Sequence, residues 1–218
     1  MKVILGGTFD PIHHAHLRTA VELREVLGID TVTLVPCHLP PHRDEPGASP
    51  ELRLRMLYSA IAGEAGLAVD ERELTRNTPS YTVDTLEELR QERGPQEPLA
   101  MVVGTDSFAS IDRWDRWQRL LELAHIIVVE RPGYTIPAES AAGQLLADNA
   151  DTDVTSLKQA PSGRVWSVSL PLLDISATGV RQAVRDGRSI RYLAPDPVCD
   201  IIAESGLYRD ESGPSFRA

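Results

Sequence analysis

The sequence predicts an α/β fold in which a doubly wound, mainly parallel sheet carries helices on both faces. Short runs of aliphatic and β-branched residues alternate with longer segments whose apolar residues recur at helical spacing. The first such run ends at Gly6-Gly7, and a helix and a second strand follow it, which predicts a βαβ unit with parallel strands. With 218 residues, 42% of them hydrophobic, the chain is long enough to bury one sizeable core.

Glycine and proline separate the predicted elements of the first half. The apolar spacing of the first helix stops before Gly28, a residue type that commonly ends helices. Pro36 to Pro50 is a long loop with five prolines, and a loop of that length inside a compact domain is usually functional or mobile. The predicted elements are strands at residues 2–5, 31–35 and 67–69 and helices at residues 15–27, 51–63 and 82–91.

Two buried strands in the second half run into polar segments. The strand from Leu99 to Val103 is followed by Gly104, and the strand from His125 to Val129 is followed by residues 130–133. We expect a helix at 138–148 on an outer edge, a strand at 165–168 and short helices between 178 and 205. Since no repeat or linker is evident, we predict one domain over residues 1–208, with a frayed polar tail over residues 209–218.

Composition excludes several classes of function. A net charge of −10 argues against nucleic acid as a partner, because phosphate backbones are bound through Lys and Arg. The apolar start is too short for a signal peptide, and no apolar run approaches the length of a membrane span. Cys37 and Cys199 have no metal-binding spacing, and two free thiols indicate a reducing compartment. We therefore expect a cytoplasmic protein; a monomer and a homo-oligomer both remain open.

The segment from Gly6 to Leu17 (GGTFDPIHHAHL) is the strongest candidate for a functional site. A glycine-rich turn that leaves a strand and enters a helix lets backbone N–H groups approach phosphate. His13 and His16, three residues apart, can both face one ligand at the helix start and stabilise a departing phosphate. From the spacing alone, a tight turn with one hydrogen-bonded histidine is an equal alternative.

Other segments have a structural and a functional interpretation. Ser176 or Thr178 can cap a helix whose first turn carries Arg181, which suits an anion but also suits a cap beside a surface arginine. Asp106 is by default a helix cap, and Arg131 by default a surface residue. Trp114 and Trp117 would ordinarily be core aromatics, and we place Trp117 in the core.

Four stretches, in order along the chain, resemble the adenylyltransferases that act on nicotinate mononucleotide, a family of the H-I-G-H-type nucleotidyltransferase superfamily with a Rossmann-like fold. The stretches span about four fifths of the chain and are specific when taken together. They are residues 6–17, residues 77–82 (NTPSYT), residues 104–107 (GTDS) with Trp114, and residues 175–181 (ISATGVR).

The resemblance implies transfer of AMP from ATP to nicotinate mononucleotide, with release of pyrophosphate. It implies that His13, His16 and Arg181 are the catalytic residues, and that Mg²⁺ arrives with ATP and needs no protein ligand. The ATP-binding residues that it implies are Gly6, Gly7, Thr8, Phe9, His16, Gly104, Asp106, Ser176, Thr178 and Arg181. Those that it implies for the acceptor are His42, Arg43, Tyr81, Thr82, Trp114, Asp115 and Arg131, with His42 and Arg43 on a mobile loop that would close over anionic substrate.

Three departures from the family pattern bear on the site. Ala15 replaces the glycine of H-x-G-H, which costs nothing if the position is helical. Cys37-His38 stands where relatives often carry asparagine. Asp115 puts an acid beside the pocket implied for the nicotinate carboxylate, so its side chain must point away and leave only its backbone N–H as a donor.

Three alternatives remain from the sequence. A sister transferase would act on phosphopantetheine or CTP, but residues 77–82 and Trp114 argue against it. A nucleotide sensor on the same fold would bind ATP without releasing pyrophosphate, and the intact His13, His16 and Arg181 disfavour it. A dinucleotide-binding dehydrogenase lacks support, because the glycine turn is not G-x-G-x-x-G.

Overall fold

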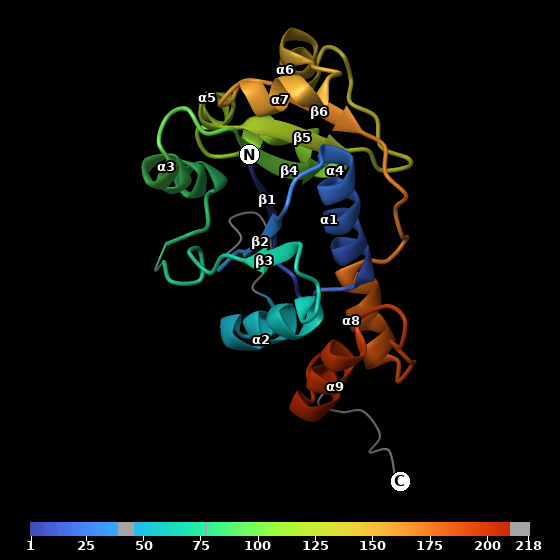
Figure 1. The fold of residues 1–218 in the computed structure, drawn as a ribbon. Coiled ribbons are helices and arrows are strands. Elements are labelled where there is room, and N and C mark those ends of the chain that lie inside the picture. The colour runs from blue at the N-terminus through green and yellow to red at the C-terminus, as the bar shows by residue number, and fades with distance from the viewer. Residues whose placement is uncertain (39–45, 77, 210–218) are drawn as a thin grey trace.

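The computed structural model describes residues 1–38, 46–76 and 78–209, and its strands form a six-stranded sheet with helices on both faces (Figure 1). All neighbouring strands are parallel, in the order β3-β2-β1-β4-β5-β6. This is the order of a chain that winds outward from β1 in one direction and then in the other, so the predicted doubly wound class is confirmed. The strands are β1 (Lys2–Gly7), β2 (Val32–Pro36), β3 (Leu67–Val69), β4 (Leu99–Gly104), β5 (His125–Val129) and β6 (Val165–Val168).

Helices and short 3₁₀ turns (η) connect the strands. The first helix ends at Gly28, as predicted, because Gly28 adopts the left-handed conformation (φ 55°) and donates its N–H to the last turn. The elements are α1 (His14–Leu27), α2 (Pro50–Ile61), α3 (Thr82–Arg93), α4 (Thr105–Phe108), η1 (Ile111–Arg113), η2 (Trp117–Arg119), α5 (Leu120–Leu123), α6 (Ala141–Asn149), α7 (Val154–Gln159), α8 (Ala177–Arg185) and α9 (Asp196–Ser205).

The two faces of the sheet bury two separate apolar clusters. Val3 and Ile4, which are adjacent on β1, belong to different clusters because successive side chains of a strand point to opposite faces. The cluster that contains Val3 includes residues of α1, α2, α7 and α9, and the cluster that contains Ile4 includes residues of α3, α5 and α6. Both faces of the sheet are therefore covered, as a parallel sheet requires.

Some predicted helix bounds are wrong, and local capping explains the differences. The helix expected at 51–63 begins at Pro50, because the Ser49 side chain accepts the N–H of Leu52 at 3.3 Å. The helix expected from residue 138 begins at Ala141, because Ser140 caps it by accepting the N–H of Gly143 at 3.0 Å. The short helices α4, α5 and α7 were not predicted. Trp117, expected in the core, is only partly buried.

Helices from both ends of the chain meet beyond the carboxyl end of β1. Figure 1 shows α8 and α9 close to α2 and to the start of α1. The backbone N–H of His14 donates to the carbonyl of Leu193 at 3.0 Å, which joins the start of α1 to the segment between α8 and α9. Of the tail expected to fray, only Arg209 lies among the described residues.

Candidate active site

The carboxyl ends of β1 and β4 lie side by side where the winding of the sheet reverses. From β1 the chain moves to β2 and then β3 on one side, and β4 takes the free side of β1. Ligands of doubly wound sheets bind at such a switch point. Gly6 faces open space there, since a Cβ atom built on it would meet nothing within 4 Å. The end of β1 therefore leaves room for a ligand beside the backbone.

The turn after β1 is shaped by Phe9 and a cis peptide bond. Phe9 has a positive φ of 49°, and the bond between Asp10 and Pro11 is cis. The Phe9 ring is 2% exposed and meets the His16 ring edge-on, with 5.1 Å between the ring centroids. The turn thereby places an aromatic ring under the first turn of α1, where it fixes the orientation of His16.

His13 and His16 lie together at the start of α1, as their spacing predicts. Their rings stack with centroids 3.7 Å apart and planes 21° apart. His13 is the N-cap residue of α1 and is 3% exposed, and its Nδ1 has no hydrogen-bond partner within the described part of the chain. An unsatisfied buried nitrogen costs free energy unless a ligand bonds to it. Ala15, between the two histidines, is helical.

Burial, together with the smaller effect of the positive charges of Arg131 and His14, lowers the pKa of His13 to about 4. His13 is therefore neutral at pH 7 in the protein without ligand. A neutral imidazole can donate one hydrogen bond to a phosphate oxygen without holding a permanent charge in a buried site. The charge of Arg131, which follows β5, lowers the pKa of His13 at the start of α1, so the two residues lie near the same space.

The lowered pKa of His13 predicts a loss of stability in acid. Between about pH 6.5 and 4 the unfolded chain binds a proton at His13 that the folded chain does not, so the free energy of unfolding falls as the pH falls. From pH 7 to 4.5 this group contributes a loss of about 2–3 kcal/mol. Urea unfolding at the two pH values should therefore show a smaller loss in His13→Gln than in wild type, by about that amount. Identical losses in the two proteins would contradict the lowered pKa.

Asp10 joins Arg181 and two distant segments to the glycine turn. Its carboxylate accepts the N–H groups of Gly47 and Ala48 at 2.8 and 3.1 Å and the hydroxyl of Tyr208 at 2.7 Å. The Arg181 guanidinium donates to the backbone carbonyl of Asp10 at 2.7 Å and lies 3.8 Å from the carboxylate. Arg181 on α8 is thereby brought to the turn that carries His13 and His16.

The start of α8 is capped as the sequence predicts. Ser176 accepts the N–H of Gly179 at 3.1 Å. Thr178 accepts a hydrogen bond from the second terminal nitrogen of Arg181 at 3.3 Å, and both Ser176 and Thr178 are exposed. The hydroxyls and the guanidinium therefore lie around one helix N-terminus, which favours an anion.

Arg53 supports the same turn from α2 and was missed from the sequence. It is 0% exposed, and its guanidinium donates to the carbonyl of Thr8 at 2.8 Å and to that of Cys37 at 2.7 Å. A signal was present, since Arg53 lies three and four residues before Met56 and Leu57 on the buried stripe of α2. Cys37 also contacts the turn, with its thiol 3.6 Å from the hydroxyl of Thr8.

Gly104, Asp106 and Arg131 form the part of the site at the ends of β4 and β5. A Cβ atom at Gly104 would lie 2.6 Å from Asp106 Oδ1 and 2.8 Å from Arg131 Nε, so a larger residue there would displace these two side chains. Arg131 is exposed and pairs with Asp106 at 3.3 Å. Asp106 Oδ1 is buried and has no hydrogen-bond partner among the residues described. A cavity of about 600 Å³ opens beside this group, with Thr105 and Arg131 in its lining.

The residues expected to bind the acceptor lie at the start of α3 and after η1. Tyr81 is the N-cap residue of α3, Thr82 is its first residue, and Trp114 follows η1 directly. Tyr81 and Trp114 are partly buried and pack against the same apolar cluster, the one that contains Ile4. The carboxylate of Asp115 is bonded to Arg116 at 2.8 Å.

Residues 37–38 connect this region to the end of β2. The N–H of His38 donates to the side chain of Ser80 at 2.9 Å, and Ser80 is buried. His42 and Arg43 of the expected closing loop, and Asn77 of the NTPSYT stretch, lie outside the described residues.

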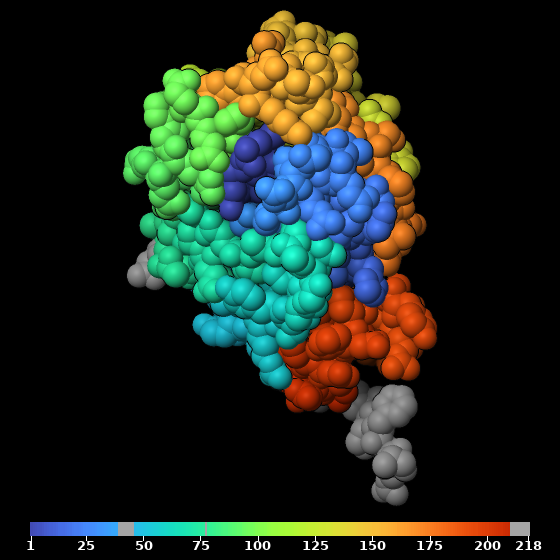
Figure 2. All heavy atoms as spheres, viewed as in Figure 1, coloured from blue at the N-terminus to red at the C-terminus, as the bar shows by residue number. Residues whose placement is uncertain are grey.

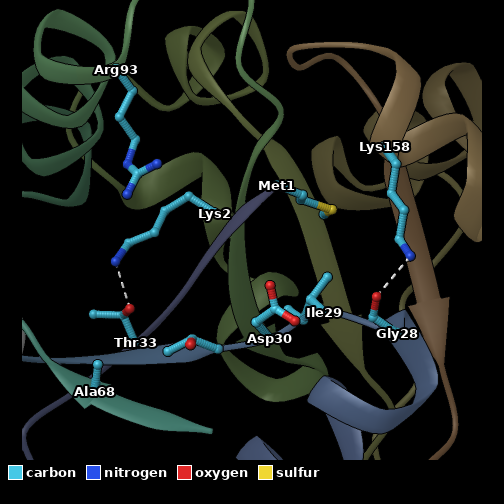
Figure 3. A pocket seen from close by; sticks show the side chains of 10 residues that line it. Met1, Lys2, Gly28, Ile29, Asp30, Thr33, Ala68, Arg93 and Lys158 are labelled. Carbon is cyan, nitrogen blue, oxygen red and sulfur yellow. Dashed lines mark hydrogen bonds between the residues drawn. The ribbon is translucent and has the colours of Figure 1, made fainter.

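A second pocket lies at the opposite end of the strands from the candidate site, beside the amino end of β1. Figure 2 shows it as a hollow over the first residues of the chain, and Figure 3 shows its lining. The pocket has a volume of about 460 Å³. Its basic side chains already have partners. Lys2 donates to the hydroxyl of Thr33 at 2.6 Å, and Lys158 donates to the carbonyl of Gly28 at 3.0 Å. Arg93 forms an ion pair with Glu97. None of the candidate site residues lines it.

Neither a cluster of metal-ligating side chains nor a membrane-spanning helix is present in the part of the chain that the structure describes. In residues 1–38, 46–76 and 78–209, no group of three or more His, Cys, Asp or Glu side chains could hold a metal ion. In those same ranges no helix has the length and apolar character to cross a membrane. Cys37 and Cys199 form no disulfide.

Comparisons with known proteins agree with one another. The model of the Cytidylyltransferase-like family matches residues 4–183. A relative from Marinobacter nauticus, named "Probable nicotinate-nucleotide adenylyltransferase", is 55% identical over 95% of this chain and 96% of its own. A relative of the same name from Cellvibrio japonicus is 48% identical over 94% of this chain and 97% of its own.

The fold also matches a solved structure. Plasmodium falciparum nicotinic acid mononucleotide adenylyltransferase complexed with NaAD superposes with a TM-score of 0.71 and covers 95% of this chain and 98% of that one. Sequence identity between the two is 20%, so this likeness supports the fold.

Proposed function

The chain belongs to the Cytidylyltransferase-like family and, within it, to the nicotinate-nucleotide adenylyltransferases, and from this premise we propose which residues perform the reaction. The enzyme transfers AMP from ATP to nicotinate mononucleotide and yields nicotinate adenine dinucleotide and pyrophosphate. The relatives favour this acceptor over the phosphopantetheine and CTP alternatives. The observation that carries the residue assignment is the meeting of His13, His16 and Arg181 at the end of β1.

ATP binds across the ends of β1, β4 and β5 in this proposal. Its triphosphate lies against the backbone of residues 6–9 and the start of α8, where the N–H groups of Ser176 and Thr178 and the Arg181 guanidinium offset its charge. The adenosine lies beside Gly104 and Asp106, next to the cavity of about 600 Å³. The lack of a side chain at Gly104, where a Cβ would strike Asp106 and Arg131, lets the backbone approach the nucleotide.

The chemistry is a single in-line displacement at the α-phosphorus of ATP. A 5′-phosphate oxygen of nicotinate mononucleotide forms the new P–O bond while the bond to pyrophosphate breaks. The attacking phosphate is already anionic at neutral pH, so no general base is required. His13 and His16 donate hydrogen bonds to phosphate oxygens on which charge builds, and positioning with electrostatic stabilisation supplies most of the rate.

Enzymes that use ATP in this way generally need a divalent metal ion. We infer that Mg²⁺ reaches the site bound to ATP and keeps mostly water and phosphate ligands, as Mg²⁺ commonly does. The residues around the triphosphate are histidines, hydroxyls and arginine, a set that suits phosphate oxygens rather than a metal ion. Mg²⁺ would neutralise part of the charge of the triphosphate and of the leaving pyrophosphate. We propose a cytoplasmic location, because the free thiols of Cys37 and Cys199 suit a reducing compartment.

The acceptor binds between α3 and the segment after η1. The pyridine ring stacks on Trp114, and its carboxylate accepts the backbone N–H groups of Thr82 and Asp115. Tyr81 and Trp114 both pack against the apolar cluster that contains Ile4, so α3 and the segment after η1 rest on the same part of the core. Arg131, together with His42 and Arg43 of the loop, is proposed to bind the phosphate of the mononucleotide.

We predict that the enzyme prefers nicotinate mononucleotide over its amide by a large factor in kcat/KM. Two N–H donors suit a carboxylate, whereas an amide would place its own N–H against one of them, and such a mismatch is penalised heavily. Pyrophosphate release from ATP should be measured with each acceptor on wild type, Trp114→Ala and Trp117→Ala. Trp114→Ala should raise KM for the acceptor, while the control Trp117→Ala, three residues along, should not. Equal efficiency of wild type with both acceptors would reject the acid preference.

A further inference from the structure

Arg116 has an unusual backbone and binds three carboxylates at once. Its φ of 45° and ψ of 42° are left-handed, a conformation that side chains other than Gly, Asn and Asp seldom adopt. The guanidinium bonds Asp115 at 2.8 Å and Glu87 at 3.2 Å, and it also pairs closely with Asp84. These contacts compensate for the strained backbone.

The three carboxylates come from the two segments that enclose the proposed acceptor pocket. Asp84 and Glu87 lie on the first two turns of α3, which begins at Thr82. Asp115 follows Trp114, on the other side of the pocket. Arg116 therefore connects the two backbone N–H donors proposed for the nicotinate carboxylate, and it directs the Asp115 side chain to itself.

Charge makes this arrangement important for an anionic acceptor. Asp84, Glu87 and Asp115 would present three negative charges next to the pocket, in a chain whose net charge is already −10. Such a group repels a nicotinate carboxylate and has little effect on a neutral carboxamide. The hydrogen bond from Arg119, and to a lesser extent that from Arg116, holds the pKa of Glu87 below its usual range, so the Glu87 carboxylate stays charged at neutral pH beside these two cations.

We propose that Arg116 is a specificity-determining residue that favours the acid acceptor over the amide by neutralising these carboxylates and holding Asp115 away from the pocket. The inference rests on the proposed function, because it takes the backbone N–H groups of Thr82 and Asp115 as the carboxylate donors. Arg116 itself does not contact substrate. Its charge makes the electrostatic potential at the pocket less negative, and its bond to Asp115 fixes the position of that side chain.

Arg119 provides a matched control. It lies three residues from Arg116, and it bonds Glu87 at 2.5 Å and Glu122 at 3.3 Å, but among the described residues it forms no hydrogen bond or ion pair with Asp115 or Asp84. Arg119→Gln removes one positive charge beside Glu87 while leaving the bonds of Arg116 to Asp115 and Asp84 in place. Arg116→Gln and Arg116→Lys keep a non-glycine residue at the left-handed position, and Lys retains the charge.

The experiment measures kcat/KM for nicotinate mononucleotide and for its amide on wild type and the three variants, at low and high salt, with the melting temperature of each. In Arg116→Gln the acid-to-amide ratio should fall about three- to fivefold at low salt, the size expected for one uncompensated charge a few ångströms away in water. The fall should shrink at high salt, because salt screens exposed charges. Arg119→Gln and Arg116→Lys should retain most of the wild-type ratio.

The outcomes separate this inference from the proposed function. A wild-type preference for the acid that Arg116→Gln leaves unchanged would overturn the role of Arg116 alone. Equal losses with both acceptors and a lower melting temperature would also overturn it, since they indicate a structural role. If Arg116→Lys lost as much of the ratio as Arg116→Gln, neutralisation by charge would be rejected. Equal wild-type efficiency with the two acceptors would overturn the acid assignment and the role of Arg116 together.

Discussion

Replacing His16 with alanine is expected to lower kcat on the order of 10²-fold or more, with little change in the KM for ATP. The reason is that a hydrogen bond to a phosphate oxygen strengthens as charge builds on the leaving group, so its loss affects the transition state more than the bound substrate. Steady-state pyrophosphate release at saturating acceptor, over a range of ATP concentrations, separates the two constants. A kcat within a few-fold of wild type would remove His16 from the mechanism.

His14 supplies the control for this variant. It lies between the two stacked histidines in sequence and is partly buried, and its backbone N–H bonds Leu193. His14→Ala should keep kcat within a few-fold of wild type. His16→Ala also removes the ring that stacks on His13 at 3.7 Å, so the position of His13 needs a separate test. His16→Gln, which retains a donor on a side chain of similar reach, should recover part of the lost rate.

Much of the fold follows from local sequence patterns. Strands such as 125–129 are short apolar runs in a parallel sheet, and both faces of such a sheet are covered, so the run itself predicts the element. The stop of α1 at Gly28 and the cap of α8 at Ser176 are likewise local, because each depends on one residue and its near neighbours. The short helix α7 was missed because its six residues are too few to show a helical period.

The candidate site likewise contains local features, which the sequence predicts, and long-range contacts, which it does not. The pairing of His13 with His16 depends on helical spacing, and the sequence predicts it. The bonds of Asp10 to Arg181 and Tyr208 join residues 171 and 198 positions apart, so no local pattern contains them. Arg116 was missed for a related reason, because its left-handed backbone is stabilised by acids on α3 rather than by its own neighbours alone. Contacts between residues far apart in the sequence therefore bring the remaining site residues to the local motif.

Arg53 illustrates how such a contact supports the site energetically. It is fully buried on α2, and its guanidinium is bonded to carbonyls at the ends of β1 and β2. Burying a guanidinium is costly, and hydrogen bonds to the charged group offset that cost at about 1.5–3 kcal/mol each. The carbonyls of Thr8 and Cys37 remain in place in any variant, so loss of the donor leaves them without a hydrogen bond.

Arg53→Met is therefore expected to lower the free energy of unfolding by about 2–4 kcal/mol, because two partly buried carbonyls lose their charged donor while the side-chain volume is roughly kept. Urea unfolding at pH 7 measures the change. Arg55→Met is the matched control on the same helix: Arg55 is 56% exposed and pairs with an exposed Glu204 at 3.2 Å, so its loss should cost no more than about 0.5 kcal/mol. The folded fraction of Arg53→Met should also show a lower kcat/KM, since the Thr8 carbonyl belongs to the turn that we propose binds the phosphates. A stability equal to that of Arg55→Met would show that the buried guanidinium does not support the turn.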